Sequence, residues 1–195
     1  MSLALSISTK KQHVIAIDKA ISVKRDGQSY RVINKTCTKF QIVGNTLYFF
    51  CGDMLIGEMF KQEIAKVKDR SLNGVINLAK SLWEKFNQED RIYIGVYGFN
   101  ETGETELSFF SSQADFVPIT ANGDDRTLRV SYGFKQDEAS KLLSNLPLND
   151  VKTELINVMK KLSCEGIGNG VDFIVLKNDG IEHISSNDLD EEKSD

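Results

Sequence analysis

Residues 2–18 read SLALSISTKKQHVIAID, and this stretch decides the fold. Its first half alternates apolar residues with small or polar ones, which predicts a half-buried β-strand over residues 3–7. Residues 10–12 are polar and predict a turn. The nearly continuous apolar run 13–17 then predicts a second strand that ends at Asp18. The chain therefore opens with a strand pair.

Turn signals and a change of periodicity divide the rest of the chain. Asp26-Gly27 and Gly44-Asn45 each separate two short apolar runs, as the turns of β-hairpins do. Two later segments carry apolar residues at helical spacing, and Asp53 and Ser71 are their predicted N-caps. In all, we predict further strands over 20–23, 30–33, 40–43, 46–51, 91–99, 105–111, 116–120, 127–131, 171–176 and 181–184, and helices over 54–67, 71–86, 137–143 and 150–162.

Blocks of strands that alternate with blocks of helices are typical of the α+β class. Two antiparallel sheets packed face to face, with a helix pair on each outer face, would account for every block. This predicts a four-layer αββα sandwich. No linker rich in Pro, Gly or Ser divides the chain, so we expect a single domain over residues 1–184.

The net charge of −4 comes from 28 acidic and 24 basic residues, and it is unevenly placed. Residues 185–195 carry all of it, which predicts an acidic, disordered C-terminal tail beyond a neutral body. Basic residues are scattered, which argues against a nucleic-acid partner. No apolar run approaches 18 residues and no signal peptide is visible, so we expect no membrane span and a cytoplasmic location.

The common chemical motifs give no assignment. A phosphate-binding loop is absent, and the glycines of residues 166–170 follow a predicted helix, the reverse of a dinucleotide-binding context. His13 and His183 have no ligand partners at metal-binding spacing, and no pair of cysteines is closely spaced. We therefore predict neither a cofactor nor a metal.

The start of the chain offers one reactive constellation. If Met1 is removed, Ser2 carries both a hydroxyl and a free α-amine. An α-amine has a pKa of about 7.7–8.0, so it can act as the general base for the hydroxyl of its own residue. The predicted strand that follows would hold Ser2 in place.

Several segments resemble the N-terminal-nucleophile (Ntn) hydrolases, specifically the proteasome β-subunit and HslV peptidase family. Asp18 stands sixteen residues after Ser2, which is the spacing of that family. The remaining likeness lies in the order of short motifs, namely Ala16-Ile17-Asp18, Lys39-Phe40, Gly44-Asn45, Cys51-Gly52-Asp53, the glycines of 166–170 with strand 171–176, and Lys177-Asn178-Asp179-Gly180.

The resemblance implies an αββα fold and a peptidase that cleaves amides with Ser2, supported by Asp18, Lys35 and Glu165. It also implies a homo-oligomeric ring and an unfoldase partner. The chain departs from the family at three polar positions, where Asn34, Gly168 and Tyr132 stand. Two alternatives therefore remain open. One is a catalytically inactive proteasome-like subunit that acts in self-assembly or partner binding, and the other is an unrelated α+β binding module.

Overall fold

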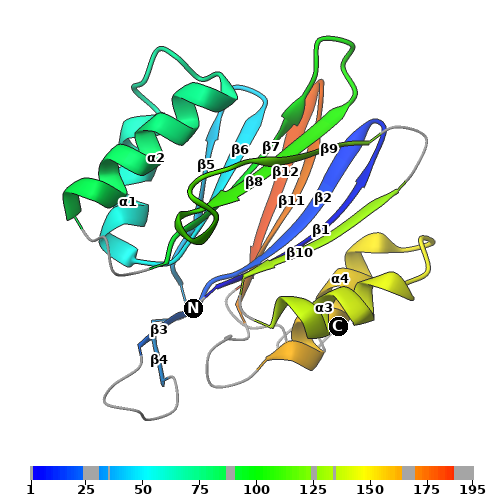
Figure 1. Ribbon diagram of the computed structural model, residues 1–195. Helices are drawn as coiled ribbons and strands as arrows, with labels where there is room; N and C mark the ends of the chain where they lie inside the picture. Colours follow the sequence, from blue (N-terminus) through cyan, green and yellow to red (C-terminus); the bar gives the residue numbers. More distant parts are fainter. Residues whose placement is uncertain are drawn as a thin grey trace.

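The computed structural model describes residues 2–23, 31–34, 36–86, 91–123, 127–133, 135–163 and 170–186, and Figure 1 shows their arrangement. The N-terminal strand pair lies in the middle of the first sheet. This sheet is antiparallel throughout, with the order β10-β1-β2-β11-β12. Its strands are β1 (Leu3–Thr9), β2 (Gln12–Asp18), β10 (Leu128–Gly133), β11 (Val171–Lys177) and β12 (Gly180–Ser186).

The second sheet is also antiparallel, and its strands follow one another in chain order from β5 to β9. They are β5 (Phe40–Val43), β6 (Thr46–Cys51), β7 (Tyr93–Phe99), β8 (Thr105–Ser111) and β9 (Ile119–Asn122). A separate two-stranded sheet consists of β3 (Ile21–Val23) and β4 (Arg31–Asn34).

The helices are α1 (Met54–Ile64), α2 (Leu72–Phe86), α3 (Gln136–Ser144) and α4 (Val151–Leu162), with one 3₁₀ turn, η1 (Ser112–Ala114). The predicted cap of the first helix is confirmed, because the Asp53 carboxylate accepts a hydrogen bond from the Ile56 amide at 2.9 Å. Ser71 likewise accepts from the Gly74 amide at 3.2 Å. Local capping thus fixes where both helices begin.

Strand β1 is buried on both faces rather than on one. Leu3, Leu5 and Ile7 pack against α3 and α4, while Ala4 faces the second sheet. Ser6 and Ser8 are fully buried too. The alternation of large and small residues in β1 therefore separates two faces that are both buried. The face with the small residues lies between the two sheets, where aromatic side chains from the second sheet fill the space.

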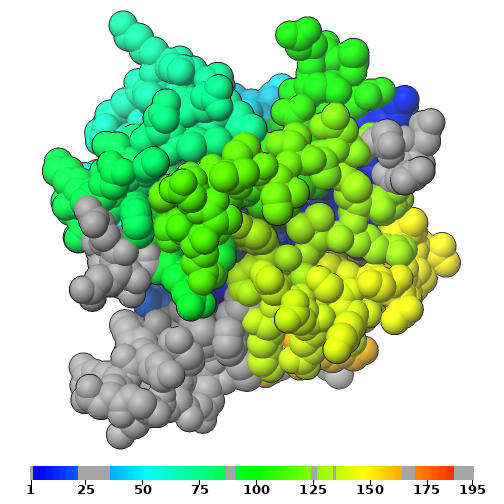
Figure 2. Space-filling model, in the orientation of Figure 1, coloured from blue at the N-terminus to red at the C-terminus, as the bar shows by residue number. Residues whose placement is uncertain are grey.

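The two large sheets pack face to face through an apolar cluster drawn from both. Helices α1 and α2 pack on part of the other side of the second sheet through a cluster around Phe60, and α3 and α4 pack on part of the outer side of the first sheet. The space-filling view shows how little of β1 and β2 reaches the surface on one face (Figure 2). No helix in the described part of the chain is both long and apolar enough to span a membrane.

The α+β class is confirmed, but the predicted four-layer αββα sandwich is wrong. The described chain forms two antiparallel five-stranded sheets, a separate β3–β4 pair and four α-helices, and sheet dominates. The helices do not extend over the edge strands, since most residues of β9 and β12 are exposed. The helices, of 9 to 15 residues, thus leave one edge strand of each sheet open on the outer face.

One predicted strand begins later than expected. We predicted a strand over 116–120, but Asp115 and Phe116 have positive φ angles of 48° and 58°, and β9 starts at Ile119. The left-handed backbone turns the Phe116 side chain into the core beside Trp83, at a ring separation of 5.7 Å. Burial of this aromatic ring therefore overrides the local strand propensity.

Candidate active site

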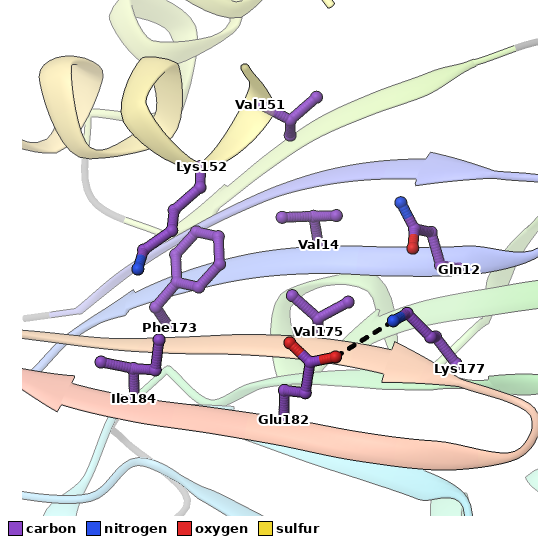
Figure 3. A pocket seen from close by; sticks show the side chains of 9 residues that line it. All are labelled: Gln12, Val14, Val151, Lys152, Phe173, Val175, Lys177, Glu182 and Ile184. Atoms are coloured by element: carbon purple, nitrogen blue, oxygen red, sulfur yellow. Dashed lines mark hydrogen bonds and ion pairs between the residues drawn. The ribbon is translucent and has the colours of Figure 1, made fainter. Parts of the chain in front are cut away.

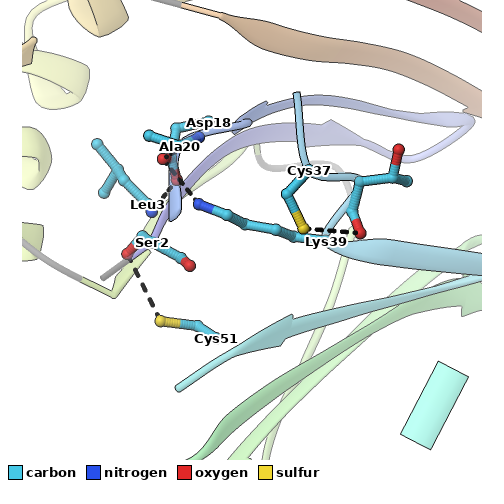
Figure 4. Close-up of polar contacts among 8 residues, drawn as sticks. Ser2, Leu3, Asp18, Ala20, Cys37, Lys39 and Cys51 are labelled. Atoms are coloured by element: carbon cyan, nitrogen blue, oxygen red, sulfur yellow. Dashed lines mark hydrogen bonds and ion pairs between the residues drawn. The ribbon is translucent and has the colours of Figure 1, made fainter. Parts of the chain in front are cut away.

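The candidate site is centred on Asp18, the last residue of β2, which is fully buried. Its carboxylate accepts three hydrogen bonds. The amide of Leu3 donates to Oδ1 at 2.6 Å, and the amide of Ala20 and the ammonium of Lys39 donate to Oδ2 at 3.1 and 2.8 Å (Figure 4). Asp18 thus ties the start of β1 to the residue that precedes β5.

Lys39 comes from the segment before the second sheet and is itself 8% exposed. Its side chain extends toward Asp18, so a buried ion pair bridges the two sheets (Figure 4). Burial raises the pKa of Asp18 above its ordinary value, whereas the charge and hydrogen bond of Lys39 and the Leu3 amide oppose this rise. A buried carboxylate with this many donors is held in one position.

Ser2 lies beside this ion pair, directly before β1, and is 6% exposed (Figure 4). The thiol of Cys51 donates to the Ser2 carbonyl at 3.6 Å. Gly133 approaches the same carbonyl so closely that a Cβ at this position would overlap it, and its φ of 107° also favours glycine. The backbone of Ser2 is therefore fixed by β2, β6 and β10 together.

The structure brings two of the four predicted site residues together. Ser2 and Asp18 are adjacent, because the amide that follows Ser2 donates to the carboxylate. Lys35 and Glu165 lie outside the described residues, as does Gly168. Among the described residues, the lysine that contacts Asp18 is Lys39, which the sequence indicated only as part of the Lys39-Phe40 motif before a strand.

Tyr132, one of the departures from the family pattern, points between the sheets. Its ring packs on Phe109 at 4.6 Å and on Tyr93 at 5.5 Å, and its hydroxyl donates to the carbonyl of Phe110 at 3.3 Å. Burial raises the pKa of the Tyr132 phenol. The side chain is thus a packing element of the inter-sheet core.

The chemistry that these residues offer is nucleophilic and electrostatic. They combine a serine at the start of a rigid strand, a buried carboxylate and a buried ammonium. Within the described ranges, no three His, Cys, Asp or Glu side chains gather in a way that could hold a metal ion.

No protein-family model and no curated protein sequence matches the chain.

Proposed function

We propose that this chain is an amide hydrolase of the N-terminal-nucleophile kind, a proteasome- or HslV-like peptidase, with Ser2 as its nucleophile after removal of Met1. One observation carries the proposal. A buried Asp18–Lys39 ion pair is hydrogen-bonded to the amide directly after Ser2. Burying the two charges of Asp18 and Lys39 next to Ser2 costs free energy of desolvation. A role for this ion pair in the chemistry of Ser2 would explain why it is buried at this place.

In the proposed reaction, the α-amine of Ser2 takes the proton of its own hydroxyl as Oγ attacks the carbonyl carbon of the substrate. The amide C–N bond breaks, the amine product leaves with that proton, and an ester to Ser2 remains. Water then hydrolyses the ester and restores the hydroxyl. Lys39 supplies positive charge beside the amine and favours its neutral, basic form, while Asp18 holds Lys39 in position.

The second candidate is a catalytically inactive subunit of the same kind that acts in self-assembly or partner binding. The low exposure of Ser2, 6%, favours it, because a nucleophile must be reached by its substrate. Apolar side chains that could meet another copy are exposed in and just before the edge strand β9, with Ile119 at 73% and Val117 at 62%. A homo-oligomeric ring, an unfoldase partner and a cytoplasmic location are parts of this proposal in both versions.

The decisive experiment measures the mass of the purified full chain before and after incubation with an epoxyketone or β-lactone probe. We expect the mass of a chain without Met1, and one probe adduct on Ser2. Ser2→Thr keeps the hydroxyl and the α-amine and is expected to be labelled. Ser2→Ala keeps a small second residue, so Met1 is still removed, but it lacks the nucleophile and is expected to stay unlabelled.

Two results would separate the versions. A retained Met1 contradicts the peptidase, because the amine would then not belong to Ser2. Removal of Met1 without labelling, together with a solution mass well above the 21.9 kDa of one chain, supports the inactive subunit instead.

A further inference from the structure

A groove lies on the outer face of the first sheet, beside the first turn of α4 (Figure 3). Its volume is about 330 Å³. The groove is open because α4 packs over β1 and β2 but leaves the edge strand β12 exposed. The groove lies on the face of the sheet opposite the inter-sheet core.

The groove combines an apolar floor with a polar rim, in which Lys177 pairs with Glu182 at 3.0 Å and Lys152 stands on the α4 side. The floor consists of side chains from three adjacent strands, namely Val14, Phe173, Val175 and Ile184. Ile184 is 47% exposed, although its strand partner Phe173 is almost fully buried. Lys152 places its ammonium 5.6 Å from the centre of the Phe173 ring. This chemistry suits an apolar side chain with carboxylates beside it.

The chain itself contains such a segment. Residues 187–195 follow the last residue of β12 and read NDLDEEKSD, with a net charge of −4 from five acids and one lysine. Leu189 is the single apolar residue among them and lies between Asp188 and Asp190. It comes five residues after Ile184, and the three residues beyond Ser186 can span roughly 10 Å. Leu189 is thus within reach of the groove.

We propose that residues 187–195 dock into this groove of their own chain, with Leu189 on Ile184 and Phe173 and with the neighbouring carboxylates beside Lys152. Tethering makes a weak contact sufficient, because a short covalent link gives an effective concentration on the order of millimolar. Docking removes the Ile184 side chain from water and pairs the excess negative charge of the chain with a lysine. The acidic segment is then an intramolecular cover for an exposed sheet face.

A carbodiimide that joins amines to carboxylates in contact tests this docking on the full chain. We expect an amide between Lys152 and Asp188 or Asp190, mapped by mass spectrometry, with a yield that does not change over a 100-fold range of protein concentration. Leu189→Met should retain that yield, and Leu189→Ser should lower it at least five-fold. Neither substitution alters charge or a buried position of the described fold.

A second measurement reads the apolar contact directly. The methyl resonances of Ile184 should shift when residues 187–195 are deleted, whereas those of Ile119, exposed on the other sheet, should not. The absence of the Lys152 cross-link, or an equal yield in Leu189→Ser, would overturn the proposal. So would cross-linked dimers whose yield rises with concentration, because they would mean that the segment docks on a second copy.

Discussion

Replacing Asp18 by Asn is expected to lower the free energy of unfolding by about 3–5 kcal/mol, because it leaves the ammonium of Lys39 buried without its counter-charge. The two atoms of the ion pair are 2.8 Å apart, and their side chains are 0% and 7% exposed. The carboxylate now accepts hydrogen bonds from the Lys39 ammonium and the Ala20 amide. An Asn side chain would turn its own N–H groups toward these two donors, which cannot accept them. Urea denaturation at pH 7 measures the change.

A double variant shows whether the loss of stability comes from the ion pair itself or from any change of side chain at position 18. In Asp18→Asn with Lys39→Met, neither residue is charged and the aliphatic length of the lysine is kept. We therefore expect the double variant to be less destabilised than the sum of the two single variants by at least about 1 kcal/mol. Additive losses would mean that the two side chains contribute independently of each other.

The exposed pair Glu63–Lys66 is the matched control. Its two atoms are 3.0 Å apart, close to the separation in the buried pair, but its side chains are 41% and 67% exposed. Lys66→Met should therefore change the free energy of unfolding by less than about 1 kcal/mol. A cost comparable with that of Asp18→Asn would show that burial is not the source of the effect.

Asp18 could be predicted from the sequence, whereas Lys39 as its partner could not. A carboxylate that ends an apolar strand is visible as a break in the pattern, and its place relative to Ser2 is fixed by one tight turn. Lys39 lies 21 residues further on, with β3 and β4 in between. Surface loops change length at little cost, so counting across them does not locate a partner. The position directly before a strand, Lys39-Phe40, was the better signal.

The helices and most strands could likewise be predicted, because caps and periodicity act locally. How much of each sheet the helices cover could not be predicted, because this depends on how the helices pack in the folded chain. The exposed strand β12 is an example. Its residues alternate less clearly than those of β1, and the sequence does not reveal that α4 stops short of them.

His13 was predicted to lie in an apolar strand and not to bind a metal, and in the structure it is a buried polar group between the sheets. Its ring is fully buried, with Nδ1 2.7 Å from the hydroxyl of Ser8 and Nε2 2.8 Å from the carbonyl of Gly98. Burial lowers the pKa of His13 from 6.5 to about 4, against the opposing effect of the Gly98 carbonyl. The imidazole is therefore neutral in the folded protein at pH 7.

This lowered pKa predicts a loss of stability in mild acid. Between pH 6.5 and about 4 the unfolded chain binds a proton at His13 that the folded chain does not bind, so the free energy of unfolding falls as the pH falls. The contribution of neutral His13 to the free energy of unfolding is fully present above pH 6.5. Each pH unit between the two pKa values removes about 1.4 kcal/mol, so about 3 kcal/mol is lost by pH 4.

Comparison of variants isolates the His13 contribution, because Asp18 and the surface carboxylates titrate in all of them. His13→Gln can keep one hydrogen bond but cannot be protonated, so it is expected to be less stable than the wild type at pH 7 and to lose less stability by pH 4. The other histidine, His183, lies 3.0 Å from the Asp172 carboxylate and is present in both proteins, so its contribution cancels in the comparison. Equal acid sensitivity in His13→Gln and the wild type would mean that His13 is protonated in the fold and that the buried Ser8–His13–Gly98 arrangement tolerates a charge.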